Sequence, residues 1–182
     1  MQLNMKSGRV ESVLWLPSPN CDSRLNARYI NAIIIHAISL PPSQYGSSYV
    51  EDFFCNQLDR AEHPYFNEIS SLKVSAHFYI KRTGILVQFV STKDRAWHAG
   101  ESCLGKMTAV NDFSIGIELE GCDEDHFTHQ QYQTLIELTH CLRKAYPAIR
   151  LNTIVGHSDI APGRKTDPGT HFNWDKYKFS QI

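Results

Sequence analysis

One stretch of the chain alternates strictly between apolar and polar residues: Phe113-Ser114-Ile115-Gly116-Ile117-Glu118-Leu119-Glu120. Side chains of a β-strand point alternately to its two faces, so the pattern predicts a strand with one apolar face. The residues expected on that face are Phe113, Ile115, Ile117 and Leu119. Glu118 belongs to the other face and therefore points away from this apolar layer.

Two further strands are predicted to end at histidines. Residues 31–35 form a short, β-branched apolar run that ends at His36, which is typical of a strand buried on both faces. Residues 149–155 form a second run and lead into Gly156-His157. Scaffolds often place functional groups where a strand feeds into a loop, so both histidines are candidates for a functional site.

Helices are predicted between and after these strands. Thr128 and Gln131 form a capping box that opens a helix, and Pro147 ends it. The buried stripe of this helix is expected to consist of Tyr132, Leu135, Leu138, Leu142 and Tyr146. A shorter helix is expected over residues 49–58, and a short turn over residues 174–177.

A β-hairpin completes the predicted elements. Residues 78–81 and 85–90 read as its two strands, and the turn Arg82-Thr83-Gly84 joins them. Strands and helices are thus interspersed along the chain. The pattern predicts an α/β (α+β) fold: a single domain, residues 1–182, with a mixed central β-sheet flanked by helices.

The composition excludes several classes of protein. The chain has 182 residues, 18 Lys and Arg against 19 Asp and Glu, and a net charge of -1. Binding to a nucleic acid requires a basic surplus or patch, which this sequence lacks. The longest aliphatic run, residues 32–35, is too short to span a bilayer, so no membrane insertion is expected.

The N-terminus and the cysteines indicate a cytoplasmic protein. The first nine residues contain no apolar stretch that resembles the core of a signal peptide. The five cysteines are odd in number, widely scattered and never in C-x-x-C spacing. We therefore expect free thiols in a reducing compartment rather than disulfides or a cysteine zinc site.

Nine histidines are the unusual feature of the composition. His36 and His157, with Asp167 ten residues after His157, have the ligand types of a catalytic zinc site. The spacing alone is weak evidence, because any chain with nine histidines yields some such trio, and on spacing alone the sequence favours structural histidines over metal ligands. Asp159 is the alternative carboxylate ligand.

Glu118 and Lys165 are candidates for the remaining catalytic roles. Hydrolysis at a metal requires a carboxylate that is not itself a ligand and that moves a proton, and Glu118 fits this role. Lys165 lies two residues from Asp167, where a cation can stabilise an oxyanion. By pattern alone, a solvated strand glutamate and a surface lysine are equally good interpretations.

His77 and His98 form a second group of candidates. His77 precedes the hairpin, and His98 follows Trp97 in the segment Arg95-Ala96-Trp97-His98-Ala99-Gly100. Either histidine could donate a hydrogen bond to substrate or support a metal ligand. The alternative is that both are structural, and the sequence favours this alternative for His98.

Taken together, several motifs resemble those of the type 2 amidases, which share a fold with peptidoglycan recognition proteins and a phage lysozyme. The resemblance runs in order from about residue 17 to 174. The segments that together carry it include Val74-Ser75-Ala76-His77, Asn111-Asp112-Phe113-Ser114 through Gly121, Gly156-His157-Ser158-Asp159-Ile160-Ala161-Pro162 and Arg164-Lys165-Thr166-Asp167-Pro168-Gly169. It implies a zinc enzyme that hydrolyses the amide bond between a muramyl lactyl group and L-alanine.

The resemblance also implies roles for individual residues. His36, His157 and Asp167 match the zinc ligands of these amidases. Glu118 matches the residue that transfers protons, and Lys165 matches the residue that stabilises the oxyanion. We further expect Trp97 to offer an apolar face to the sugar of the substrate; a core aromatic is an equally good interpretation.

Particular positions point to the cytoplasmic branch that recycles 1,6-anhydro-muramyl peptides. Many other members have Tyr where this chain has Ala76, and Cys where it has Asp167. The chain departs from the branch at Ala37, where relatives have Asn, and at Ala109, where they have Arg. The loss of that arginine leaves the recognition of the stem peptide in question, and Lys73 is a basic residue that can serve instead.

The expected substrate is a small muropeptide, and the expected state is a monomer. Two alternatives have different consequences. A phage or secreted amidase would attack intact peptidoglycan, whereas a non-catalytic peptidoglycan-binding module would use the same fold without hydrolysis. Such a module is expected to lack a metal ligand or the proton-transferring residue, and this chain has all five.

Overall fold

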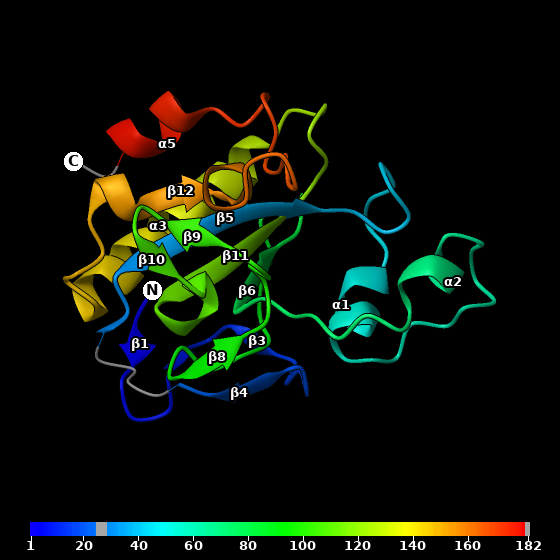
Figure 1. The fold of residues 1–182 in the computed structure, drawn as a ribbon, viewed down its shortest axis with the longest axis horizontal. Helices are drawn as coiled ribbons and strands as arrows, with labels where there is room; N and C mark the ends of the chain where they lie inside the picture. Colours follow the sequence, from blue (N-terminus) through cyan, green and yellow to red (C-terminus); the bar gives the residue numbers. More distant parts are fainter. Residues whose placement is uncertain (25–28, 181–182) are drawn as a thin grey trace.

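The computed structural model describes residues 1–24 and 29–180, and within them a mixed sheet of six strands forms the centre of the molecule (Figure 1). The strand order is β12-β5-β11-β6-β7-β3. Neighbouring strands are parallel except for the antiparallel hairpin β6–β7. The bounds are β3 (Leu14–Trp15), β5 (Ala32–Ile38), β6 (Phe78–Ile80), β7 (Leu86–Gln88), β11 (Ser114–Glu120) and β12 (Ile154–Gly156). The predicted fold class is confirmed.

Short strand pairs and helices surround this sheet. The pairs are β1 (Leu3–Asn4) with β2 (Arg9–Val10), β4 (Cys21–Ser23) with β8 (Asp94–Ala96), and β9 (Cys103–Leu104) with β10 (Met107–Thr108). The helices are α1 (Tyr49–Phe54), α2 (Phe66–Ile69), α3 (His129–Ala145), α4 (His157–Ile160) and α5 (Trp174–Phe179), with 3-10 turns η2 (Val110–Asp112) and η3 (Leu151–Thr153). Figure 1 shows that α1 and α2 lie on an extension beyond one end of the sheet.

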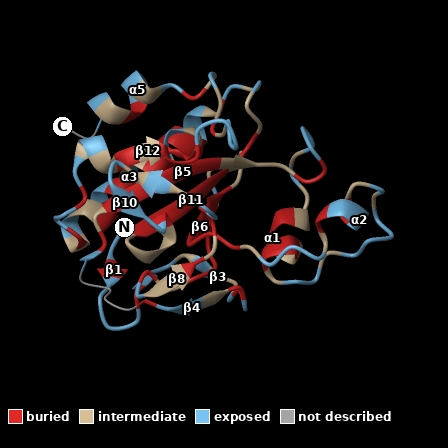
Figure 2. Cartoon of the chain, in the orientation of Figure 1, coloured by how far each residue is buried: buried red, intermediate tan, exposed pale blue. Residues whose placement is uncertain are grey.

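The middle strands β5 and β11 are buried on both faces (Figure 2). Ile33 and Ile35 of β5 belong to the core on the α3 side of the sheet, together with Ile115, Ile117 and Leu119 of β11. Ala32 and Ile34 instead pack with Ala99, Val110 and Ile160 on the opposite face. Since side chains alternate along a strand, His36 also points to this second face.

Helix α3 forms as the sequence predicts. The Thr128 hydroxyl accepts a hydrogen bond from Gln131 N (3.1 Å), and the Gln131 side chain accepts one from Thr128 N (3.0 Å). The predicted stripe packs into the main core: Tyr132, Leu135, Leu138, Leu142 and Tyr146. The helix therefore covers the face of the sheet opposite His36.

Several predicted boundaries are wrong. The helix expected over residues 49–58 ends at Phe54, because Asn56 turns the chain with a φ of 59°. The strand expected over residues 149–155 begins only at Ile154; before it, Thr153 Oγ1 accepts a hydrogen bond from Arg150 N (3.0 Å) and favours a local turn. Phe113 precedes β11 and packs in the second core, not with Ile115.

Two further features bear on the predicted class of protein. Among the described residues, no helix is long and apolar enough to cross a membrane. The five cysteines are free thiols.

Candidate active site

The pairing of parallel strands brings the candidate residues together near the carboxyl ends of these strands. His36 of β5 and Glu118 of β11 are direct partners in the register of these two strands. Strand β12 pairs with the other side of β5 and ends at Gly156, so His157 follows at the same end of the sheet as the first residue of α4. Residues more than 80 positions apart in sequence thereby become neighbours.

His36, His157 and Asp167 converge on one point. Their Nδ1, Nδ1 and Oδ2 atoms lie 3.0 to 3.2 Å from one another. In the described part of the chain, this is the one group of His, Cys and acidic residues arranged to hold a metal ion.

The chemistry of these three atoms fits a cation. Two imidazole nitrogens and a carboxylate oxygen each bring a lone pair to the same small space, and a single metal ion satisfies all three at once. His157 Nε2 lies 3.3 Å from the Ala99 carbonyl, to which it donates, so the lone pair of this ring is on Nδ1. The usual ligand geometry of neutral histidines, with the second nitrogen bound to an acceptor, is therefore present.

The charges of the group are also those that a metal requires. Burial lowers the pKa of His36 to about 4, although the Asp167 carboxylate opposes the shift. Burial would raise the pKa of Asp167, but its close contacts with the His157 and His36 rings outweigh this effect and hold the pKa well below its usual range. At neutral pH, His36 is thus neutral and Asp167 ionised, which are the protonation states that bind metals.

Asp159, the alternative ligand, has a different role. Its Oδ2 accepts a hydrogen bond from Gly156 N (2.8 Å) at the start of α4. Asp167 instead reaches the histidines because its backbone carbonyl accepts a hydrogen bond from Ser158 N (3.0 Å), which ties its loop to α4.

Glu118 lies beside this group in a nearly dry environment, with 9% of its surface exposed. Its Oε2 is buried without a hydrogen-bond partner in the described part of the chain. Burial, and then the Asp167 carboxylate, raises the pKa of Glu118 well above its usual range, whereas Lys165 opposes the shift. The carboxylate is therefore a stronger base than an exposed glutamate, and one of its oxygens is free to take a proton.

One cavity of about 720 Å³ is lined by Glu118 together with His36, His157 and Asp167. Lys165 is exposed in its wall, and half-buried Trp97 is part of the lining. One end of the cavity is polar, at the His36 group. Another part of the wall is apolar and contains Leu40, Phe53, Tyr65, Ile69 and Leu72, mostly from the extension that carries α1 and α2.

The remaining predicted substrate contacts differ in position. His98 lines the cavity, and its Nδ1 lies 2.9 Å from His36 Nε2. His77 is fully buried and outside the lining; its Nδ1 accepts from Gly116 N (3.0 Å), and its Nε2 lies 2.8 Å from Arg24 Nη2. Burial leaves no route from His77 to a substrate, so a direct contact is not supported. Lys73 is exposed and outside the lining, between Leu72 and Val74, which belong to it.

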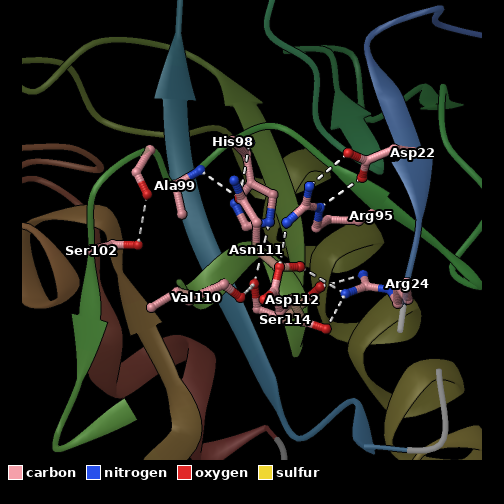
Figure 3. A network of polar contacts seen from close by, with 11 residues as sticks. Asp22, Arg24, Arg95, His98, Ala99, Ser102, Val110, Asn111, Asp112 and Ser114 are labelled. Carbon is pink, nitrogen blue, oxygen red and sulfur yellow. Dashed lines mark hydrogen bonds and ion pairs between the residues drawn. The ribbon is translucent and has the colours of Figure 1, made fainter. Parts of the chain in front are cut away.

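Several supporting residues are not evident from the sequence. Ser114 and Asn111 hold the segment of His98 in place, as Figure 3 shows. The alternation of residues 113–120 puts Ser114 on the face of Glu118, which is the signal that could have identified it. Arg164 lines this cavity and a neighbouring one of about 650 Å³ that contains Ala109.

Comparison with known proteins identifies relatives along the whole chain. The family model described as N-acetylmuramoyl-L-alanine amidase matches residues 26–170. The 1,6-anhydro-N-acetylmuramyl-L-alanine amidase AmpD of Haemophilus influenzae is 48% identical over 174 residues, covering 96% of this chain and 95% of that protein.

Solved structures agree with these sequence matches. A crystal structure of a selenomethionine derivative of AmpD has a TM-score of 0.95 and 42% identity, with 100% of both chains covered. The amidase AmiD of Escherichia coli, in complex with the substrate anhydro-N-acetylmuramic acid-L-Ala-D-gamma-Glu-L-Lys, has a TM-score of 0.62 and 26% identity. That match covers 96% of this chain and 61% of AmiD.

Proposed function

The chain belongs to the N-acetylmuramoyl-L-alanine amidase family, and on that premise we propose that it recycles peptidoglycan fragments in the cytoplasm. It hydrolyses the amide bond between the lactyl group of 1,6-anhydro-N-acetylmuramic acid and the L-alanine of the stem peptide. The name of the Haemophilus influenzae relative and the substrate bound to AmiD support this choice. The protein acts as a monomer, and residues 1–182 form one zinc amidase domain.

The observation that carries the proposal is the meeting of a metal-binding group and a buried carboxylate in one cavity. His36, His157 and Asp167 provide three ligand atoms within 3.2 Å of one another. Glu118 lies in the same cavity and is not part of that group. A hydrolytic metal site needs both parts, whereas a module that only binds needs neither.

Zinc is the proposed cofactor, held by His36, His157 and Asp167. When bound, it supplies Lewis acidity, which lowers the pKa of a water molecule to roughly 7 and polarises the amide carbonyl.

Glu118 moves the proton in the proposed reaction. Its carboxylate takes a proton from the attacking water as the carbon–oxygen bond forms, and its raised pKa favours this step. The Lys165 ammonium stabilises the negative charge that develops on the carbonyl oxygen. Glu118 then delivers the proton to the alanine nitrogen as the carbon–nitrogen bond breaks, and the products are a lactyl carboxylate and a free amine.

The cavity suggests how the substrate lies. We place the sugar against Trp97 and the apolar wall, because the bicyclic anhydro sugar has few hydroxyl groups to satisfy. We place a carboxylate of the stem peptide near Lys73, whose charge is exposed at the rim.

Muropeptide hydrolysis tests the proposal directly. Protein of known zinc content is incubated with 1,6-anhydro and reducing-end muropeptides, and the products are identified by mass. We expect cleavage between the sugar and L-alanine, fastest for the anhydro form. Preference for intact peptidoglycan would favour the phage-type or secreted amidase, and binding without cleavage would favour the non-catalytic module.

A further inference from the structure

We propose that His98 is a positioning residue that fixes the tautomer and orientation of His36. It does so through a directed chain of hydrogen bonds that runs from His36 to His98, then to Ser114, and ends at the carbonyl of Val110. The inference rests on the proposed function in one respect only: it takes His36 as a metal ligand.

The Val110 carbonyl, at the end of this series of hydrogen bonds, determines which atom donates in each of them. The Val110 carbonyl can only accept, so the Ser114 hydroxyl 2.7 Å away donates to it. The Ser114 oxygen is then free to accept from His98 Nε2–H, at 3.3 Å. His98 therefore carries its proton on Nε2 and a lone pair on Nδ1.

That lone pair determines the state of His36. His36 Nε2 lies 2.9 Å from His98 Nδ1, so it must carry the proton and donate. The lone pair of His36 is consequently left on Nδ1, the atom that faces His157 and Asp167. A backbone carbonyl thus selects, through two side chains, the tautomer that a metal ion requires.

The surroundings of His98 hold the ring at one position. Its backbone N and that of Ala99 both donate to Asn111 Oδ1, at 3.2 and 2.8 Å (Figure 3). Its ring lies on Gly116 of β11, where a Cβ would overlap His98 Cγ and come within 2.6 Å of Cδ2. Only glycine leaves room for this ring, which gives the glycine of β11 a specific purpose.

The same segment supports the second histidine. The carbonyl of Ala99, the next residue, accepts from His157 Nε2–H at 3.3 Å. Residues 98 and 99 therefore supply the acceptors for both histidines, one from a side chain and one from the backbone.

Zinc affinity, measured by competition with a chelator, tests the role of His98. His98→Leu fills much of the same space but removes the acceptor, whereas His98→Asn keeps an acceptor oxygen bonded to Cγ, as Nδ1 is in histidine. We expect His98→Leu and Gly116→Ala to weaken zinc binding by roughly 10- to 100-fold. His98→Asn should recover most of the affinity.

Thr139→Val is the matched control. It removes a buried polar group away from the site: the hydroxyl of Thr139 on α3, which is hydrogen-bonded to Tyr177 OH of α5 at 2.7 Å. Its thermal stability should fall, as in His98→Leu, but its zinc affinity should not. Equal affinities of wild type and His98→Leu would overturn the proposal.

The histidine tautomers of the zinc-loaded wild type give an independent readout, because this measurement requires no substitution. Long-range 1H–15N spectra should show His36 and His98 both protonated on Nε2. A proton on His98 Nδ1 would contradict the proposal. His36→Ala distinguishes a failure of the proposed metal site from a failure of the positioning role. If His36→Ala binds zinc normally, the assigned metal site is wrong. If it loses zinc while His98→Leu does not, only the positioning role of His98 is wrong.

Discussion

Glu118 illustrates how one buried side chain acquires its chemistry from its neighbours. Its strand partner is His36, its surface is 9% exposed, and the Asp167 carboxylate adds to the effect of burial on its pKa. The same glutamate on an edge strand would be an ordinary solvated residue. The register of β11 against β5 makes the difference.

Glu118→Gln should therefore separate metal binding from turnover. The amide has nearly the same shape but cannot take a proton, so kcat should fall by roughly 10²–10⁴-fold. Zinc content, measured on the same sample, should equal that of the wild type. Near-normal turnover in a fully loaded variant would exclude Glu118 as the proton carrier.

His77 has a consequence for stability rather than for catalysis. Burial, and then the Arg24 guanidinium, lowers its pKa well below the usual value. In the unfolded chain it titrates near pH ~6.5, so below that pH the unfolded state binds a proton that the folded state refuses. Its contribution to stability is therefore complete above about pH 6.5 and is lost as the pH falls.

His77→Gln should flatten the pH dependence of the unfolding free energy of the metal-free protein. Between about pH 6 and pH 5, the slope should decrease by up to ~1.4 kcal/mol per pH unit, which corresponds to one proton. Urea unfolding at several pH values measures this, and the slope is independent of any constant loss of stability. Identical slopes in wild type and variant would show that His77 does not take part.

At the level of elements, helix α3 is the clearest case of local sequence controlling structure. Its capping box closes on itself, and Thr128 Oγ1 also donates to the Arg82 carbonyl at 2.7 Å, which joins the helix to the β6–β7 turn. Thr128→Ala should cost about 1 kcal/mol of unfolding free energy. Thr128→Ser keeps the hydroxyl and should lose much less; equal losses in denaturant titrations would show that the cap is not responsible.

The elements that could be predicted are those with strong local patterns. Strands β5 and β11, the β6–β7 hairpin and α3 follow from periodicity and turn residues. Strand β3 and the pair β4–β8 do not, because their pairing depends on partners far along the chain. In β4–β8, for example, Arg95 bridges Asp22 and Asp112 at 2.6 Å, a contact that no local pattern reveals.

Across the whole molecule, the site depends on strand order. The sequence places His36, Glu118 and His157 at or near strand ends but cannot indicate that β11, β5 and β12 are adjacent. It also cannot distinguish His98, 2.9 Å from His36, from His77, which lies deeper against Arg24. Only the motifs of the amidase family, taken in order, identify the set before the fold is known.

Zinc should stabilise the folded molecule as a whole, because its ligands come from three separate segments that are close together only when folded. At a free zinc concentration of about 100 times Kd, the gain in unfolding free energy should be about 2.7 kcal/mol. Thermal unfolding with and without chelator measures it. His36→Ala should show no such gain, and a full response in this variant would contradict the assigned ligands.

The position of bond cleavage tests the central claim most directly. Zinc-loaded protein is incubated with a 1,6-anhydro-muramyl peptide in H₂¹⁸O, and the masses of the products are measured by mass spectrometry. The reaction is followed before and after addition of chelator. We predict that one heavy oxygen enters the lactyl carboxylate of the sugar, that the peptide leaves unlabelled with a free L-alanine amine, and that chelator stops the reaction. Label in the peptide, or no cleavage by fully loaded protein, would contradict the account.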